Sequence, residues 1–332
     1  MKKVLITGVA GLLGANFSRH LLKIGYKVIG IDDMSGGYID NVPSDCKLYN
    51  FNLVDSEKVN EVFKNEKPDY VYHFAAYAAE GLSPFIRNFN YKNNLIASVN
   101  VINACINNDI SKIIFTSSMA VYGKGNPPFT ESQLPSPEDP YGIAKYAVEL
   151  DLEQAKKQFG LDYSIVRPHN VIGKYQNIWY KYPNVVGIWI RQAIAGEPLT
   201  IYGDGSQTRA FSDISFYNEP FEKLMTQHSG EIFNIGADKP YTINEVSDIV
   251  IKVAKKHGFK SFKVFLEPRN EVHVAYCNHD KAKNILEFSD STDLNKSIEA
   301  MFEWALVQKN KNVNYTNYEI TKNIYSYWKK WL

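Results

Sequence analysis

The chain has 332 residues, of which 45% are hydrophobic, and a formal net charge of +1. This length can bury a large core and is typical of about two domains, while the near-zero charge gives no field for nucleic acid or an anionic membrane. The three cysteines lie far apart and form neither a disulfide framework nor a zinc-binding pattern. No stretch approaches the roughly 18 apolar residues of a membrane span. We therefore expect a cytoplasmic protein that binds no metal, nucleic acid or membrane.

A glycine-rich turn follows the first apolar run of the chain. Gly8, Gly11 and Gly14 are spaced three apart, and apolar residues then recur at helical spacing. Such glycines allow a tight strand-to-helix turn and let backbone N–H groups approach a pyrophosphate. A second apolar run ends at Asp32 and Asp33, where an acid accepts hydrogen bonds from a ribose diol and repels a 2′-phosphate. The sequence therefore predicts binding of NAD rather than NADP.

Strand and helix patterns alternate through the first half of the chain. Strands are expected at 3–7, 28–31, 47–52, 70–76, 112–116 and 162–167, with helices after residue 14 and near 59–63, 88–109 and 141–158. This alternation predicts an α/β fold, a Rossmann-like doubly wound parallel sheet. Ligands of such sheets bind beyond the carboxyl ends of the strands. One crevice should therefore be lined by the small or polar residues at those ends, namely Asn52, Ala75, Ala76, Ser117, Ser118 and Asn170.

The pattern changes from about residue 171, where loops become long and rich in aromatic residues. A helix is expected near 184–196, an amphipathic helix over 242–257, and a strand that returns to the sheet over 231–236. We divide the chain into an NAD-binding domain, residues 1–170, to which that strand belongs, and a smaller lobe, residues 171–332, that mainly binds the substrate.

Tyr141 and Lys145 are four residues apart and share one face of an expected helix. The pKa of tyrosine is near 10, and lowering it by about three units takes roughly 4 kcal/mol, which the lysine and the positive nicotinamide ring can supply together. Ser118, at a strand end, can hydrogen-bond the same substrate hydroxyl. A Tyr-x-x-x-Lys pair alone is more often a solvated surface pair, but with the serine and the dinucleotide turn it favours acid–base catalysis.

The chain resembles the extended short-chain dehydrogenase/reductase enzymes of the NAD-dependent nucleotide-sugar epimerase/dehydratase family. The resemblance is carried by six motifs, at 7–14 (TGVAGLLG), 73–76 (HFAA), 117–123 (SSMAVYG), 141–145 (YGIAK), 167–173 (RPHNVIG) and 203–209 (GDGSQTR). Together these motifs are highly specific for the family and much less specific for any one reaction.

This resemblance implies a role for each matching residue. The catalytic triad is Ser118, Tyr141 and Lys145. The cofactor residues are Gly8, Gly11, Leu12, Leu13, Gly14, Asp32, Asp33, Asn52, Leu53, Phe74, Ala75, Ala76, Asn93, Thr116, Tyr141, Lys145 and Pro168. The residues that contact the nucleotide diphosphate sugar are Ser118, Asn170, Asn184, Arg209 and Arg269. Relatives also suggest a homodimer through helices 88–109 and 141–158, with Leu95, Val99, Ile102 and Ile106 as an apolar stripe that can instead face the sheet.

Three departures from the family pattern matter. Asn52 stands where the family usually has an aspartate that touches the adenine amino group, and its carbonyl can still accept that bond. Arg269 is followed by Glu271 with one residue fewer than the family motif has. Met119 and Ala120 replace the Asp-Glu pair with which dehydratases remove water, so 4,6-dehydration is not expected.

The main hypothesis is therefore a nucleotide-sugar 4-epimerase. The alternatives are a nucleotide-sugar 4-dehydrogenase or 4-keto-reductase and, from another class, a non-catalytic NAD-sensing protein. That protein would not need Ser118, Tyr141 and Lys145 together. The sequence does not identify the nucleotide or the sugar.

Several other residues have a plain structural interpretation beside a functional one. His73 reads as a packed histidine and Glu80 as a surface carboxylate rather than a substrate ligand. For His169, contact with the nicotinamide or substrate and simple packing stay equally open. The aromatic run 175–182 can stack on a sugar or anchor its loop. The aromatic tail, residues 315–332, can lie on a membrane surface, but packing on its own second lobe or on a partner subunit is favoured.

Overall fold

The structure is a computed structural model that describes residues 2–180, 184–269, 271–309, 311 and 317–331. Its centre is a seven-stranded sheet of order β11-β6-β5-β4-β1-β2-β3 in which every neighbouring pair is parallel. The strands are β1 (Lys3–Thr7), β2 (Lys27–Asp32), β3 (Lys47–Asn50), β4 (Tyr70–His73), β5 (Lys112–Thr116), β6 (Tyr163–Pro168) and β11 (Glu231–Ile235). The predicted doubly wound sheet, including its returning strand, is confirmed.

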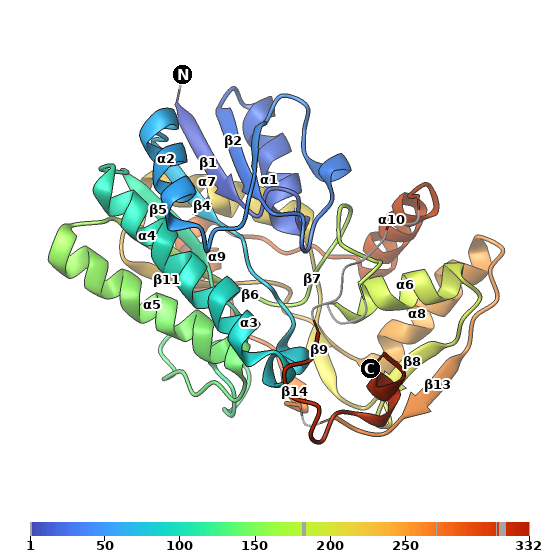
Figure 1. The fold of residues 1–332 in the computed structure, drawn as a ribbon. Coiled ribbons are helices and arrows are strands. Elements are labelled where there is room, and N and C mark those ends of the chain that lie inside the picture. The colour runs from blue at the N-terminus through green and yellow to red at the C-terminus, as the bar shows by residue number, and fades with distance from the viewer. Residues whose placement is uncertain (1, 181–183, 270, 310, 312–316, 332) are drawn as a thin grey trace.

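Helices cover both faces of this sheet (Figure 1). One face packs against α2 (Ser56–Glu66), α4 (Ala97–Asn107) and α5 (Pro140–Phe159), and the other against α1 (Leu12–Lys23), α7 (Asn218–Thr226) and α9 (Asp280–Leu286). Each helix contributes one apolar stripe, so the strands are buried on both sides and read as continuous hydrophobic runs. Of the residues after 170, the sequence analysis assigned only 231–236 to the first domain, but α7 and α9 also pack on its sheet.

The predicted helix 88–109 consists of three parts, α3 (Arg87–Tyr91), a π-helical turn (Lys92–Ile96) and α4. Its stripe residues Leu95, Ile102 and Ile106 pack against the core on this face of the sheet. The alternative that these side chains pack against the core of the sheet therefore holds for these three residues, although Leu95 and Ile106 are only partly buried.

The second lobe has its own core, between α6 (Val185–Ile194), α8 (Ile243–Lys256) and α10 (Leu294–Leu306). Three small sheets frame it, formed by β8 (Leu199–Tyr202) with β13 (Lys263–Leu266), by β12 (Pro240–Thr242), β9 (Thr208–Ala210) and β14 (Val274–Ala275), and by β7 (Val171–Ile172) with β10 (Ser212–Asp213). Short 3₁₀ turns complete the described chain, at η1 (Ile39–Asn41), η2 (Glu80–Phe85), η4 (Met119–Val121), η5 (Ile214–Tyr217) and η6 (Ser326–Trp331). In the described part of the chain, no helix is long and apolar enough to cross a membrane.

A buried ion pair joins α5 to the sheet. Arg167 on β6 donates from Nε and Nη2 to the two carboxylate oxygens of Glu149 at 2.9 and 2.5 Å, and both side chains are 3% exposed or less. The Ser117 hydroxyl donates to the same carboxylate. Buried charges are tolerated only when they are paired and hydrogen-bonded, so each partner depends on the other.

Replacing Glu149 with glutamine should therefore lower the free energy of unfolding by about 3–5 kcal/mol, because the Arg167 guanidinium stays buried without an anion. Urea unfolding measures this change. The control is Glu153→Gln, which removes the exposed partner of Lys157 on the same helix and should cost less than about 1 kcal/mol. Equal losses of unfolding free energy in the two variants would show that the buried ion pair stabilises the protein no more than the exposed one.

Candidate active site

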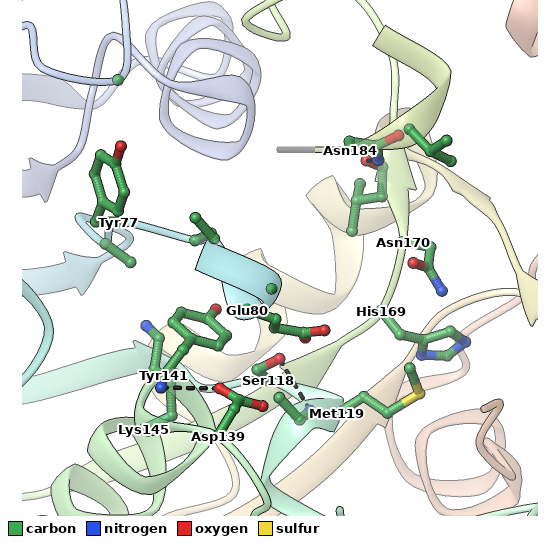
Figure 2. A pocket seen from close by; sticks show the side chains of 18 of the residues that line it. Tyr77, Glu80, Ser118, Met119, Asp139, Tyr141, Lys145, His169, Asn170 and Asn184 are labelled. Atoms are coloured by element: carbon green, nitrogen blue, oxygen red, sulfur yellow. Dashed lines mark hydrogen bonds between the residues drawn. The ribbon is translucent and has the colours of Figure 1, made fainter. Parts of the chain in front are cut away.

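One large cavity of about 1330 Å³ lies at the carboxyl ends of the strands, between the two lobes. Every residue predicted to bind the cofactor or the substrate lines it. Figure 2 shows Ser118, Tyr141 and Lys145 on one wall of this cavity, with Asn170 and Asn184 on another. The sequence expectation of a single crevice is therefore confirmed, while the role of each residue stays a prediction.

The glycine turn fits the pyrophosphate of a dinucleotide. Gly8 has a φ of +72°, and a Cβ there would lie 2.7 Å from the backbone nitrogen of Ala75. A Cβ on Gly14 would lie 2.2 Å from the Gly8 carbonyl oxygen. Only glycine is tolerated at these two positions, and the first backbone N–H groups of the 12-residue helix α1 open toward the cavity.

Asp32 and Asn52 lie at the ends of neighbouring strands, beside this turn. The Asp32 carboxylate accepts hydrogen bonds from the backbone N–H groups of Ala10 at 2.9 Å and Met34 at 2.8 Å, while burial raises its pKa. The Asn52 amide nitrogen donates to Asp33 at 2.6 Å and to the Asn93 side chain at 3.0 Å. Its carbonyl accepts from the Val54 N–H at 2.9 Å and keeps a second lone pair for an adenine amino group.

The triad residues are positioned by helix caps and by one buried bond. Asp139 caps α5 by accepting from the backbone N–H groups of Tyr141 and Gly142 at 2.9 and 3.0 Å. Ser118 begins η4 and accepts from the Ala120 N–H at 3.1 Å. Lys145 is 2% exposed and donates from Nζ to the carbonyl oxygen of Thr116 at 2.7 Å. These hydrogen bonds therefore fix the backbone that carries Ser118 and Tyr141 and the side chain of Lys145 at the cavity wall.

The expected lowering of the tyrosine pKa is not a property of these side chains alone. Burial raises the pKa of Tyr141, and the charge of Glu80 raises it further, while a hydrogen bond with Ser118 opposes both. The Lys145 Nζ lies 5.8 Å from the centroid of the Tyr141 ring, and burial lowers its own pKa to about 7. These side chains alone therefore do not favour the phenolate, and an oxidised nicotinamide ring, the second contribution in the sequence argument, would have to add positive charge.

Glu80 is exposed, as the interpretation as a surface carboxylate requires, and the surface that it lies on is the wall of the cavity, near Ser118 and Tyr141 (Figure 2). Desolvation, followed by the charge of Asp139, raises the pKa of Glu80 to about 7, although the charge of Arg209 opposes this. Glu80 is the functional candidate that sequence reasoning undervalued. The only signal was its position a few residues after the strand-end motif 73–76.

The predicted substrate residues occupy the side of the cavity that the second lobe forms. Asn170 has a φ of +42° and donates to the Ala210 carbonyl at 3.1 Å. Asn184 caps α6 by accepting from the Val186 N–H at 3.0 Å. These bonds fix both amides at the cavity wall.

Two arginines line this side of the cavity as well. Arg209 donates to the Val272 carbonyl at 2.6 Å and pairs with Glu271 at 3.3 Å. The guanidinium carbon of Arg269 lies 3.3 Å from the centroid of the Tyr202 ring. Guanidinium groups bind phosphate oxygens in a bidentate manner, so the pair suits a diphosphate.

The two histidines have different surroundings. His73 is fully buried between the Thr7 and Ser98 hydroxyls at 2.7 and 2.8 Å, and burial lowers its pKa to about 3. It is the packed histidine that was predicted. His169 lines the cavity and stacks on His279 with ring centroids 5.0 Å apart. Its location fits both open interpretations, because it is packed and also reaches the site.

The aromatic run 175–182 mainly anchors its loop. Tyr175 covers Arg19, with the guanidinium carbon 4.0 Å from its ring centroid, and Trp179 packs against the core of the second lobe. Tyr180 faces the cavity. Tyr182 lies outside the described residues.

The parallel sheet, the glycine turn and the serine–tyrosine–lysine group are together those of an extended short-chain dehydrogenase/reductase. The chain belongs to the NAD dependent epimerase/dehydratase family, whose model matches residues 4–236.

Three similar proteins share most of their length with this chain. A putative UDP-glucose 4-epimerase of Methanocaldococcus jannaschii is 30% identical over 317 residues, covering 93% of this chain and 99% of that protein. A crystal structure of UDP-glucose 4-epimerase from Thermotoga maritima with UDP-glucose has a TM-score of 0.87 at 29% identity, covering 92% of this chain and 98% of that one. A UDP-glucose 4-epimerase of Thermus thermophilus in complex with NAD has a TM-score of 0.84 at 25% identity, covering 91% and 98%.

The raised pKa of Glu80 predicts a pH-dependent stability. Because the folded protein holds this proton to about pH 7, against an ordinary value of 4.5, ionisation in the folded state costs free energy as the pH rises through that window. Glu80→Gln removes the cost. Its melting temperature relative to the unsubstituted protein should therefore rise between pH 5 and pH 8.

Thermal unfolding at a series of pH values measures this difference. The control is Glu61→Gln on α2, an exposed carboxylate. A melting-temperature difference for Glu80→Gln that stays constant with pH would contradict the assignment.

Proposed function

We propose that the protein is an NAD-dependent UDP-sugar 4-epimerase. The observation that carries the proposal is that the glycine turn, the Ser118–Tyr141–Lys145 group and the two arginines all line one cavity. The relatives described above support the nucleotide and the reaction, since one binds UDP-glucose and another binds NAD. The sugar is proposed to be a hexose that is oxidised at C4.

Each residue has a distinct task in this proposal. Arg209 and Arg269 bind the diphosphate, and Ser118 holds the sugar O4 by a hydrogen bond. Tyr141 takes the O4 proton and later returns it. Lys145, bonded to the Thr116 carbonyl, lies beside the Tyr141 ring and adds positive charge there in its protonated form. NAD held at the glycine turn supplies the acceptor and donor for the hydride at C4.

Epimerisation also needs space for the oxidised sugar to turn over while it stays bound. Ala120 lines the cavity, where it leaves more room than a larger residue would. Met119, its neighbour, carries no acid or base. Both features favour epimerisation over dehydration.

The test is incubation of UDP-glucose with the purified protein without added cofactor. We expect the C4 epimer by NMR, because the hydride returns to the sugar in each cycle. Tyr141→Phe should keep substrate binding while turnover falls by roughly 10²–10⁴, the usual contribution of a positioned acid–base group.

Absorbance at about 340 nm, read on the same samples, separates the alternatives. Stoichiometric reduced cofactor with a free 4-keto sugar and no epimer would favour the 4-dehydrogenase. A 4-keto-6-deoxy product would show dehydration and overturn the epimerase proposal. Unchanged turnover in Tyr141→Phe would exclude this residue as the proton carrier.

We also infer a homodimer through α5 and the π-helical turn before α4. Ile96, Ile143 and Leu150 on these elements are 43–46% exposed, and the last two are seven residues apart on one helical face. Leu150→Glu should convert a dimer to monomer in light scattering at micromolar concentration. Phe159→Glu, at the exposed end of α5, should not. A monomeric unsubstituted protein would contradict the inference.

A further inference from the structure

The final described segment of the chain, residues 317–331 (Figure 1, dark red), contributes residues to the lining of the cavity and begins in contact with the N-terminal domain. The backbone N–H groups of Glu319 and Ile320 donate to the Phe85 carbonyl at 2.8 and 3.2 Å. The Glu319 carboxylate accepts from the N–H groups of Asn88 and Phe89, in the first turn of α3, at 2.7 and 2.8 Å. A carboxylate is favoured at a helix N-terminus, so these bonds form a specific anchor.

The same segment then packs onto the second lobe. Trp328 is 2% exposed, and its indole N–H donates to the Tyr202 hydroxyl at 3.0 Å. The Trp328 ring also lies 5.9 Å from the ring of Phe85 in η2. The Ser326 N–H donates to Glu267 at 2.5 Å. The segment therefore connects the two domains. The favoured sequence interpretation, packing on the second lobe or on a partner subunit, is confirmed for the second lobe but did not include the contacts with the first domain.

Trp328 and Tyr202 together hold the side chain of Arg269. The guanidinium carbon lies 3.3 Å from the centroid of the Tyr202 ring and 5.5 Å from that of Trp328. The Nε atom is buried and has no hydrogen-bond partner among the residues that the structure describes. Desolvation lowers the pKa of this arginine. A cation fixed by aromatic rings, with unused donors, is suited to receive an anion from the cavity.

We propose that this C-terminal segment is part of the substrate site, with Trp328 as a positioning residue for Arg269. The ligand group involved is the diphosphate of the nucleotide sugar, so the inference rests on the proposed substrate class. Five further residues of the segment line the cavity, namely Ile320, Lys322, Asn323, Tyr325 and Tyr327. The glycine turn is formed by other elements, so changes in the segment should affect the nucleotide sugar and leave NAD binding unchanged.

The experiment compares a nucleoside diphosphate with its monophosphate, using full-length protein and calorimetry. The probe is whichever of UDP, GDP, CDP and dTDP binds the unsubstituted protein most tightly. Trp328→Ala should lower the affinity for the diphosphate roughly 3- to 30-fold, the range expected for a lost cation–π contact. It should hardly change the affinity for the monophosphate. Trp328→Phe keeps a ring over Arg269 and should lose less than about threefold.

Two further variants separate positioning from general destabilisation. Glu319→Gln removes an exposed anchor without touching the core and should weaken the diphosphate in the same direction as Trp328→Ala. Trp304→Ala removes a tryptophan that packs against the core of the second lobe and does not line the cavity. It should leave the diphosphate affinity unchanged.

The outcomes are distinguishable from a failure of the proposed reaction. In an active enzyme, Trp328→Ala should raise KM for the nucleotide sugar with little change in kcat. If the protein binds the diphosphate but has no epimerase activity, the calorimetry still decides the role of the segment. Equal losses for diphosphate, monophosphate and NAD, or no loss in Trp328→Ala, would overturn the proposal. So would a protein that binds none of the four diphosphates.

Discussion

The arrangement of the active-site wall depends on the ion pair between Glu149 and Arg167, buried directly behind it. Two charges in a protein interior are costly unless each satisfies the other. Glu149 also accepts a hydrogen bond from Ser117, which precedes Ser118, and it belongs to the helix that carries Tyr141 and Lys145. One carboxylate therefore fixes the end of β5, the helix α5 and the strand β6 relative to one another. The buried ion pair therefore acts together with the helix caps and the bond from Lys145 to the Thr116 carbonyl in fixing the positions of the triad residues.

The parts of the site that could be predicted from the sequence are those encoded by short spacings. Gly8 and Gly14 are six residues apart and meet in one turn, where each has a steric reason to lack a Cβ. Tyr141 and Lys145 share a helical face because they are four residues apart. Strand ends converge because a parallel sheet brings all carboxyl ends to one edge. Knowing the order of the elements was therefore enough to place these residues together.

The pKa of Glu80, the partners of Trp328 and the pKa of Tyr141 could not be predicted, because each depends on contacts between distant parts of the chain. Glu80 reads as exposed from its neighbours, yet the charges around it come from α5 and the second lobe. Trp328 meets a tyrosine 126 residues earlier in the chain. Stripe residues such as Leu95 show a related limit of the sequence pattern. Helical spacing identified an apolar face but did not show which neighbouring element covers it. The periodicity of apolar residues indicates that one face of a helix is buried, but only the tertiary fold determines which neighbouring element covers that face.

The C-terminal segment bears on the choice between an epimerase and a dehydrogenase. An epimerase must keep its oxidised sugar bound while the sugar turns over, whereas a dehydrogenase must let it leave. In the proposed complex, Arg269, which contacts rings from β8 and the segment, would restrain the diphosphate, while the sugar end would meet smaller groups such as Ala120. Glu319 ties the same segment to α3, so the segment that packs beside Arg269 is also anchored to the first domain. A site that holds the nucleotide diphosphate firmly and leaves space around the sugar suits C4 epimerisation, because the oxidised sugar must stay bound while it turns over.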